Sequence, residues 1–168
     1  AQDLSSYALG QDFGDATVSE GDTTVTLTNN AWKFIDVDTT VTADTYLSFD
    51  FRSNVEGEIH GIGFDTNNTL SLNWLFQLDG AQTSGLQGAA SAYTTGTGWQ
   101  SYLIKVGDYF QGDFDRLVLA MDDDAGVGAD SAFRNITVED VAPKVEVNGI
   151  AQDLSSYALG QDFGDATV

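Results

Sequence analysis

The chain repeats its own beginning. The segment AQDLSSYALGQDFGDATV at residues 1–18 recurs without a single change at residues 151–168, an offset of 150 residues. Chance does not produce an exact repeat of this length. A period of 150 residues is too long for a solenoid, whose repeats span roughly 20–50 residues, and it matches the size of a whole domain. The sequence therefore predicts one unit of a tandem array of globular domains.

The repeat also predicts the domain boundaries. The single proline, Pro143, follows the last predicted strand and precedes the second copy. We expect a β-sandwich module at residues 1–140, a linker and lead-in strand at 141–150, and the start of the next repeat at 151–168. The lead-in strand is indicated by three alternating apolar residues, Val145, Val147 and Ile150.

Two identical copies compete for one place in the fold. A single sandwich has one slot for this sequence, so one copy is expected to fill it. The other copy is then either a loose tail or a strand that is added to a neighbouring molecule. The second alternative predicts self-association through residues 1–18 or 151–168.

Hydrophobic alternation predicts the fold class. Val25 and Leu27 share one face of a short segment, and Leu47, Phe49 and Phe51 share one face of another, which is the period of a half-buried strand. Helical periodicity is absent over any useful length, and 18 glycines punctuate the chain. We therefore expect an all-β, two-sheet antiparallel β-sandwich of the jelly-roll type. Strands are predicted near residues 23–28, 46–51, 58–64, 72–78, 100–106, 116–121 and 133–138.

Charge and cysteine content exclude several functions. The net charge is −20, and it is still −17 for the 150-residue unit after the three acids of the duplicate are discounted. Such a surface repels nucleic acid and anionic membranes and attracts cations, although acidity is also a solubility device of secreted marine or salt-adapted proteins. The chain has no cysteine, which excludes disulfides, thiolate metal sites and cysteine nucleophiles.

The densest chemical motif lies at residues 121–130, MDDDAGVGAD. Three of its aspartates are Asp122, Asp124 and Asp130, and glycines follow at 126 and 128. The D-x-D-x-G spacing allows alternate carboxylates to converge on a calcium ion while a glycine takes the tight turn. The alternative is a solvated acidic turn. A second, weaker candidate ligand is Asp65, two residues before Asn67, although Asx residues are also favoured in turns.

Catalysis is not indicated. His60 is the only histidine, and alternation places it on one strand face with Glu58, Ile62 and Phe64. There it is either a hydrogen-bonded core group or part of the floor of a cleft. No G-x-S-x-G motif accompanies it, and nothing marks one pair of acids as a glycosidase pair. We therefore expect a protein that is not an enzyme.

Aromatic and amide residues indicate a possible sugar surface. Trp74 breaks the alternation and is flanked by Asn73, and an exposed indole ring is suited to stacking on a pyranose. Tyr93 and Gln82, in the loop at residues 80–98, are further candidates, with core packing as the alternative for Trp74. The other two tryptophans lie at strand entrances and are expected to pack in the core or at its rim: Trp32 and Trp99.

Three strings of the sequence resemble a known kind of module. They are GEIHGIGFD at residues 57–65, GWQSY at 98–102, and the acidic loop that precedes FRNITV at 133–138. Together they resemble a jelly-roll carbohydrate-binding module that is found, often repeated, in secreted bacterial polysaccharide-degrading enzymes and large surface proteins. The resemblance implies bound calcium with Asp122 and Asp124 as ligands, a polysaccharide partner, no catalysis, and a secreted or cell-surface location.

Two functions are compatible with the sequence. The first is a non-catalytic, calcium-stabilised carbohydrate-binding module that stacks a glycan on Trp74 or Tyr93, with hydrogen bonds from His60, Asn73 and Gln82. The second is a structural or adhesin repeat that assembles by exchange of the duplicated terminal strand.

Overall fold

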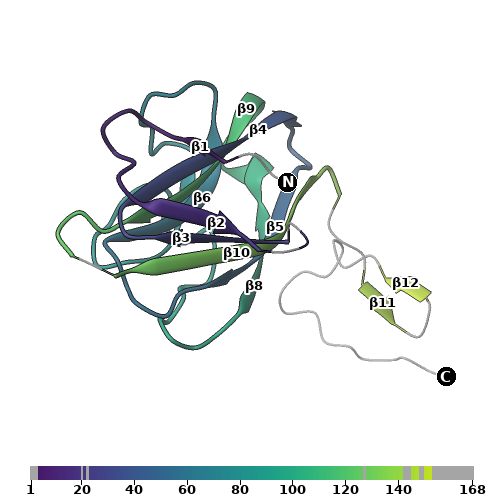
Figure 1. Ribbon diagram of the computed structural model, residues 1–168. Coiled ribbons are helices and arrows are strands. Elements are labelled where there is room, and N and C mark those ends of the chain that lie inside the picture. The colour runs from purple at the N-terminus through teal and green to yellow at the C-terminus, as the bar shows by residue number, and fades with distance from the viewer. Residues whose placement is uncertain are drawn as a thin grey trace.

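The structure is a computed structural model that describes residues 4–19, 21, 23–126, 128–141, 145–147 and 150–152. Over these residues the regular elements are β-strands, apart from one turn of 3-10 helix at Val106–Asp108. Ten of the strands form two five-stranded antiparallel sheets that face each other (Figure 1). No helix in this part of the chain has the length and apolar character needed to cross a membrane.

Each sheet draws its strands from all along the chain. The first sheet has the order β1 (Ser5–Ser6), β4 (Ala31–Val41), β9 (Gly112–Asp122), β6 (Ile59–Asp65) and β7 (Leu75–Asp79). The second has the order β2 (Asp15–Val18), β3 (Thr24–Thr28), β10 (Asp130–Glu139), β5 (Tyr46–Arg52) and β8 (Gln100–Lys105). The chain crosses repeatedly from one sheet to the other, and the predicted jelly-roll sandwich is confirmed.

The main core lies between the two sheets, where alternate residues point inward. In β5 the burial pattern alternates strictly, with Leu47, Phe49 and Phe51 buried, as the sequence predicted. Phe49 stacks on Tyr102 of β8 at a centroid distance of 5.1 Å, and Phe51 packs against Phe133 of β10 at 5.2 Å. These ring contacts join neighbouring strands of the second sheet on its core-facing side.

A second apolar layer covers the outer face of the first sheet. Its buried members are Tyr7, Ala8, Trp32, Phe34, Ile59, Leu75, Val118 and Ala120. Because both faces of this sheet are covered, all seven residues of β6 are buried. Gly63 in β6 permits this packing, since a Cβ there would collide with the backbone oxygen of Trp74.

The N-terminal copy of the repeat is part of both sheets. Strand β1 forms an edge of the first sheet, and β2 forms an edge of the second. The short N-terminal segment therefore supplies one edge strand to each sheet. The second copy begins in β12 (Ile150–Gln152), which pairs antiparallel with β11 (Val145–Val147). The predictions for residues 153–168 lie outside the described residues.

Candidate functional site

Three carboxylates converge at one end of the first sheet. Glu58, Asp122 and Asp124 each bring one side-chain oxygen within 4.8 Å of the others. The register of β6 and β9 places Ile59 opposite Asp122, and the Glu58 N–H donates to the Asp122 carbonyl at 2.7 Å. The acidic loop then folds back over this pair and delivers Asp124. Sheet register therefore adds a glutamate that is far away in the sequence to the two predicted aspartates.

The three carboxylates have different electrostatic environments. The pKa of Glu58 is lowered, first by the N–H of Ala125, which donates to it at 3.2 Å. The pKa of Asp124 is raised, first by its hydrogen bond with Glu58 and then by the charge of that group. Burial raises the pKa of Asp122, although the indole N–H of Trp32 donates to it at 3.3 Å and acts in the opposite direction. The fold thus disfavours the ionised forms of Asp122 and Asp124.

This set of oxygens is chemically suited to a hard cation. Calcium takes six to eight oxygen ligands from carboxylates, carbonyls and water. A divalent ion would also offset the charge of Glu58, which contributes to the raised pKa of Asp124 after their hydrogen bond and to that of Asp122 after burial. The residues therefore fit calcium as a partial ligand set with Glu58, Asp122 and Asp124 as members.

Asp130, which was expected to join this cluster, has a different role. One of its carboxylate oxygens accepts the backbone N–H groups of Asn54 and Val55, both at 2.8 Å, and the other accepts the Asn54 side-chain amide at 2.8 Å. Its two oxygens thus hold the neighbouring loop, and Asp130 is not among the converging carboxylates. In this structure Asp130 anchors that loop.

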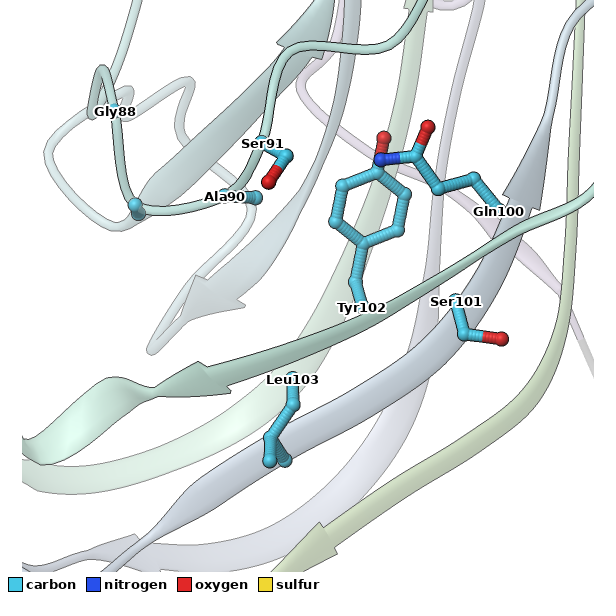
Figure 2. A pocket seen from close by; sticks show the side chains of 8 residues that line it. Gly88, Ala90, Ser91, Gln100, Ser101, Tyr102 and Leu103 are labelled. Atoms are coloured by element: carbon cyan, nitrogen blue, oxygen red, sulfur yellow. The ribbon is translucent and has the colours of Figure 1, made fainter. Parts of the chain in front are cut away.

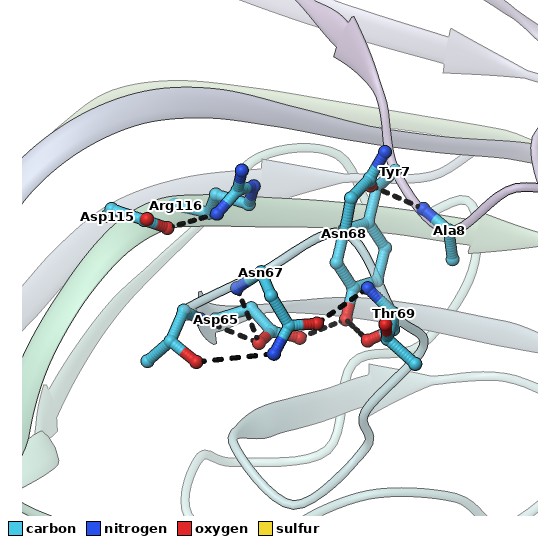
Figure 3. Close-up of polar contacts among 9 residues, drawn as sticks. Tyr7, Ala8, Asp65, Asn67, Asn68, Thr69, Asp115 and Arg116 are labelled. Carbon is cyan, nitrogen blue, oxygen red and sulfur yellow. Dashed lines mark hydrogen bonds and ion pairs between the residues drawn. The ribbon is translucent and has the colours of Figure 1, made fainter.

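Asp65 is likewise occupied by donors of the protein itself. It is 0% exposed and lies at the opposite end of β6 from Glu58. The hydroxyl of Tyr7 donates to one carboxylate oxygen, and the N–H groups of Thr66 and Asn67 donate to the other at 2.6 and 3.3 Å (Figure 3). The expected metal ligand is thus a buried acceptor that caps a turn.

His60 and Tyr93, two of the expected sugar contacts, are core residues. His60 is 0% exposed, and its Nε2 accepts the Gly57 N–H at 2.7 Å while its Nδ1 hydrogen-bonds Ser131 Oγ at 2.7 Å. Tyr93 is 4% exposed, and its hydroxyl donates to the carbonyl of Gly98 at 2.7 Å. Neither side chain presents a polar atom to a surface ligand, and both hold neighbouring segments of the core in place.

The remaining expected sugar contacts lie apart from one another. Asn73 is exposed, and Trp74 is half-buried with its ring edge-on to Phe114 at 5.3 Å. Gln82 is exposed and lies beyond the other end of β7, where its amide donates to the Glu58 carboxylate. Since a five-residue strand spans roughly 17 Å, Trp74 and Gln82 do not form one compact site.

A polar groove runs along the open edges of β7 and β8. It consists of two adjoining depressions of about 470 and 390 Å³, which share Gly88 and Ala90. Figure 2 shows the first, with loop residues on one side and side chains of β8 on the other. The first is lined by Gly88, Ala89, Ala90, Ser91, Gln100, Ser101, Tyr102 and Leu103. The second is lined by Gln77, Leu78, Asp79, Gly80, Gln82, Thr83, Gln87, Gly88, Ala90 and Ala92.

One glutamine holds the groove in shape. The amide nitrogen of Gln77 donates to the carbonyl of Gln82 at 2.5 Å, and its amide oxygen accepts from Ser84 N–H at 2.8 Å and from the Gln87 amide at 2.6 Å. Leu86 also bridges to Phe76 of β7. The loop at residues 82–87 is therefore fixed to the strand, and the groove is preformed.

A second polar surface, which the sequence did not indicate, lies on the outer face of the second sheet. The guanidinium groups of Arg52 and Arg134 lie 4.8 and 4.2 Å from the ring centroid of Trp99. Asp50 accepts from Arg134 at 2.9 Å and from Ser101 at 2.6 Å; although burial opposes it, these hydrogen bonds lower the pKa of Asp50. The only sequence signal was the alternation of β5, which points Asp50 and Arg52 outward together.

Comparisons with known proteins give no family. No protein-family model matches the chain, and no curated protein sequence matches it either.

Among solved structures, similar folds are found at low identity. A family 30 carbohydrate-binding module is 16% identical over 88% of this chain and 86% of that one, with a TM-score of 0.45. A variant of a family 29 carbohydrate-binding module complexed with cellulohexaose is 12% identical over 81% and 89%, with a TM-score of 0.44. A sialidase is 13% identical over 81% of this chain but only 17% of its own length, with a TM-score of 0.42. With TM-scores below 0.5, these likenesses give the chain neither a family nor a function.

Proposed function

We propose that the chain is a non-catalytic, calcium-stabilised module that binds a polysaccharide in the groove along β7 and β8. The observation that carries this proposal is the lining of that groove. It is lined by four glutamines and three hydroxyl residues: Gln77, Gln82, Gln87, Gln100, Ser91, Ser101 and Thr83. Neutral amides and hydroxyls, which both donate and accept hydrogen bonds, complement the hydroxyls of a sugar chain.

The charge pattern favours a neutral glycan. The chain carries a net charge of −20, yet the described lining of the two depressions contains a single carboxyl group, Asp79, whose side chain accepts from Thr95 at 2.7 Å. An anionic ligand would be repelled by the protein as a whole. A neutral polysaccharide is not repelled in this way.

The groove also favours binding over hydrolysis. Glycoside hydrolysis uses two carboxyl groups on either side of the scissile bond, about 5–9.5 Å apart. Since Asp79 is the one carboxyl in the described lining, the groove lacks the second member of such a pair. The proposed function is therefore recognition without bond cleavage.

Calcium is proposed to support the groove through one shared contact. Gln82 lines the groove, and its amide donates to the Glu58 carboxylate, which is one of the three converging carboxylates. An ion that fixes Glu58 therefore also fixes the position of Gln82. Calcium bound here would thus order both the acidic loop and one wall of the groove.

Repetition of the module would strengthen the binding of the whole protein to a polysaccharide, even where each module binds weakly. Several modules on one chain bind a long polymer with high effective concentration, so that the avidity exceeds the affinity of each module. This fits a secreted or cell-surface protein that meets long polysaccharides. The half-buried ring of Trp74 and the exposed amide of Asn73 form the proposed secondary contact at the far end of β7.

Calorimetric titration in calcium buffer with soluble hexasaccharides of glucose, xylose and mannose tests the proposal. Gln100→Ala should weaken binding about tenfold, because a lost hydrogen bond contributes roughly 1–1.5 kcal/mol. Gln111→Ala is the matched control, because Gln111 is a surface glutamine outside the groove. The proposal fails if no glycan binds, or if Gln100→Ala and Gln111→Ala behave alike. Trp74→Ala and Asn73→Ala in the same titrations test the secondary contact.

A further inference from the structure

The N-terminal copy of the repeat is held in a built slot. Tyr7 is 0% exposed, and its hydroxyl donates to Asp65 and accepts the Ser71 N–H at 3.0 Å. Next to it, Ala8 N–H donates to the side-chain oxygen of Asn68 at 2.8 Å (Figure 3). Burial raises the pKa of Tyr7, so its hydroxyl stays protonated as a donor. This end of the copy is fixed by one buried ring and its polar partners.

A second anchor follows within the same copy. The Asp12 carboxylate accepts from Lys33 Nζ at 2.6 Å and from the backbone N–H of Trp32 at 3.2 Å. The Tyr7 and Phe13 N–H groups donate to the carbonyls of Trp32 and Asn30, both at 2.8 Å. The copy therefore runs along the first residues of β4 with both backbone and side-chain contacts.

The last part of the copy is a strand. Residues 15–18 form β2, which pairs antiparallel with β3 from Asp15 opposite Thr28 to Val18 opposite Val25. Immediately before β2, any Cβ at Gly14 would collide with the backbone oxygen of Thr28. The slot thus fits particular residues at defined positions of the copy, among them Tyr7, Asp12 and Gly14.

The partners in this slot lie outside the repeated segment. Asp65, Asn68, Ser71, Lys33 and Thr28 all belong to residues 19–140, so any segment of identical sequence makes the same contacts with them. Residues 151–168 have that sequence, with Tyr157, Asp162 and Gly164 at the positions of Tyr7, Asp12 and Gly14. We propose that the slot accepts residues 151–168 of a second copy of this chain, in exchange for its own residues 1–18.

The two occupants differ in how they are tethered. Residues 1–18 are joined to β3 through the short segment 19–23, which gives them a high effective concentration at the slot. A second chain competes only at high protein concentration or when the local copy is weakened. Since donor segment and slot are different surfaces, the contact is head-to-tail, and it extends to dimers and longer chains.

A set of matched variants tests the exchange. Tyr7→Ala weakens the local occupant, Tyr157→Ala weakens the donor, and the double variant weakens both. Melting temperature and size-exclusion elution are measured for the full chain over a hundredfold range of concentration. Tyr7→Ala should form oligomers, and its melting temperature should rise with concentration by roughly 5–10 °C, because the second chain binds by mass action. Tyr157→Ala should be monomeric, with a melting temperature independent of concentration.

Two results overturn the proposal. The first is that Tyr7→Ala and the double variant melt at the same temperature at every concentration, including the case in which neither folds, because an intact donor then brings no rescue. The second is that Tyr7→Ala melts higher than the double variant but stays monomeric, since its own second copy would then fill the slot. Asp12→Ala and Asp12→Ala/Asp162→Ala repeat the comparison with a milder change outside the buried ring.

Discussion

The two ends of β6 carry similar acidic motifs with opposite fates. At one end, the oxygens of Asp65 receive the Tyr7 hydroxyl and the N–H groups of Thr66 and Asn67. At the other end, Glu58, Asp122 and Asp124 face one another with their oxygens within 4.8 Å. Sequence spacing indicated a metal in both places. The difference teaches that acidic spacing in the sequence does not by itself make a cation site. The fold must also bring several carboxylates together, as it does at the Glu58 end, where Glu58 and Asp122 converge with Asp124 although both also accept protein donors.

The largest effect on stability is expected from removing the Asp65 carboxylate at the first end of β6. Asp65→Ala leaves the Tyr7 hydroxyl and two backbone N–H groups without their acceptor, and burial makes that costly. We expect a loss of about 3 kcal/mol in the free energy of unfolding, measured by urea denaturation. Asp38→Ala, at an exposed aspartate on β4, should change it by less than about 0.5 kcal/mol. Equal effects in the two variants would contradict the distinction.

The second effect is the response to calcium. At a hundred times its dissociation constant, an ion that binds only the folded state adds about 2.7 kcal/mol to the free energy of unfolding. Thermal melts in calcium and in chelator should show this gain for the wild type and for Asp130→Asn, and should not show it for Asp124→Asn. A gain that survives in Asp124→Asn but is lost in Asp130→Asn would reverse the assignment of the two residues.

His60, on β6 between the two ends, is expected to give a pH response. Burial lowers its pKa, and its Nε2 accepts the Gly57 N–H, so the folded state holds the neutral ring. The unfolded state then binds the proton first, and stability is lost as the pH falls below about 6.5, by at most about 1.4 kcal/mol per pH unit. Denaturant melts at pH 7 and pH 5.5 should show this loss for the wild type and a smaller one for His60→Gln. An unchanged loss would assign it to other groups.

The smallest effect separates the cost of ionising the partly buried Asp122 from metal binding. The raised pKa of Asp122 means that its ionised form is disfavoured in the folded state. Its favourable contribution is therefore complete below the ordinary aspartate pKa and is lost as the pH rises through the raised value. In chelator at pH 7, Asp122→Asn should be more stable than the wild type by less than about 1 kcal/mol, because the group is partly exposed. The two proteins should converge near pH 3, and a variant that is less stable at pH 7 would contradict this account.

The sequence predicted those elements whose signal is local. The alternation of Val25 and Leu27 and of Leu47, Phe49 and Phe51 identified β3 and β5, because one face of each is buried and the other is not. It missed β4, where Ala31, Trp32, Phe34 and Ile35 are all buried. A strand that is covered on both faces loses its alternation, and the cover here comes from the N-terminal copy and loops far along the chain.

The same limit applies to the candidate sites. Asp122 and Asp124 were predicted together because they are neighbours in one loop, whereas Glu58 joins them only through the register of β6 and β9. The groove escaped prediction because its wall is a loop that folds back onto β7 through Gln77. His60, in a predicted strand, and Tyr93, in the loop at residues 80–98, were placed on a binding surface because their polar groups are suited to hydrogen bonds with a sugar. In the structure, buried partners satisfy them instead.

The most direct measurement is a nuclear magnetic resonance titration of the isotope-labelled chain in calcium buffer with a hexasaccharide that binds in the calorimetric panel. The account predicts that the side-chain amide signals of Gln82, Gln87 and Gln100 shift and saturate together, while that of Gln111 stays unchanged. Shifts confined to Trp74 and Asn73, with the groove amides unaffected, would contradict it.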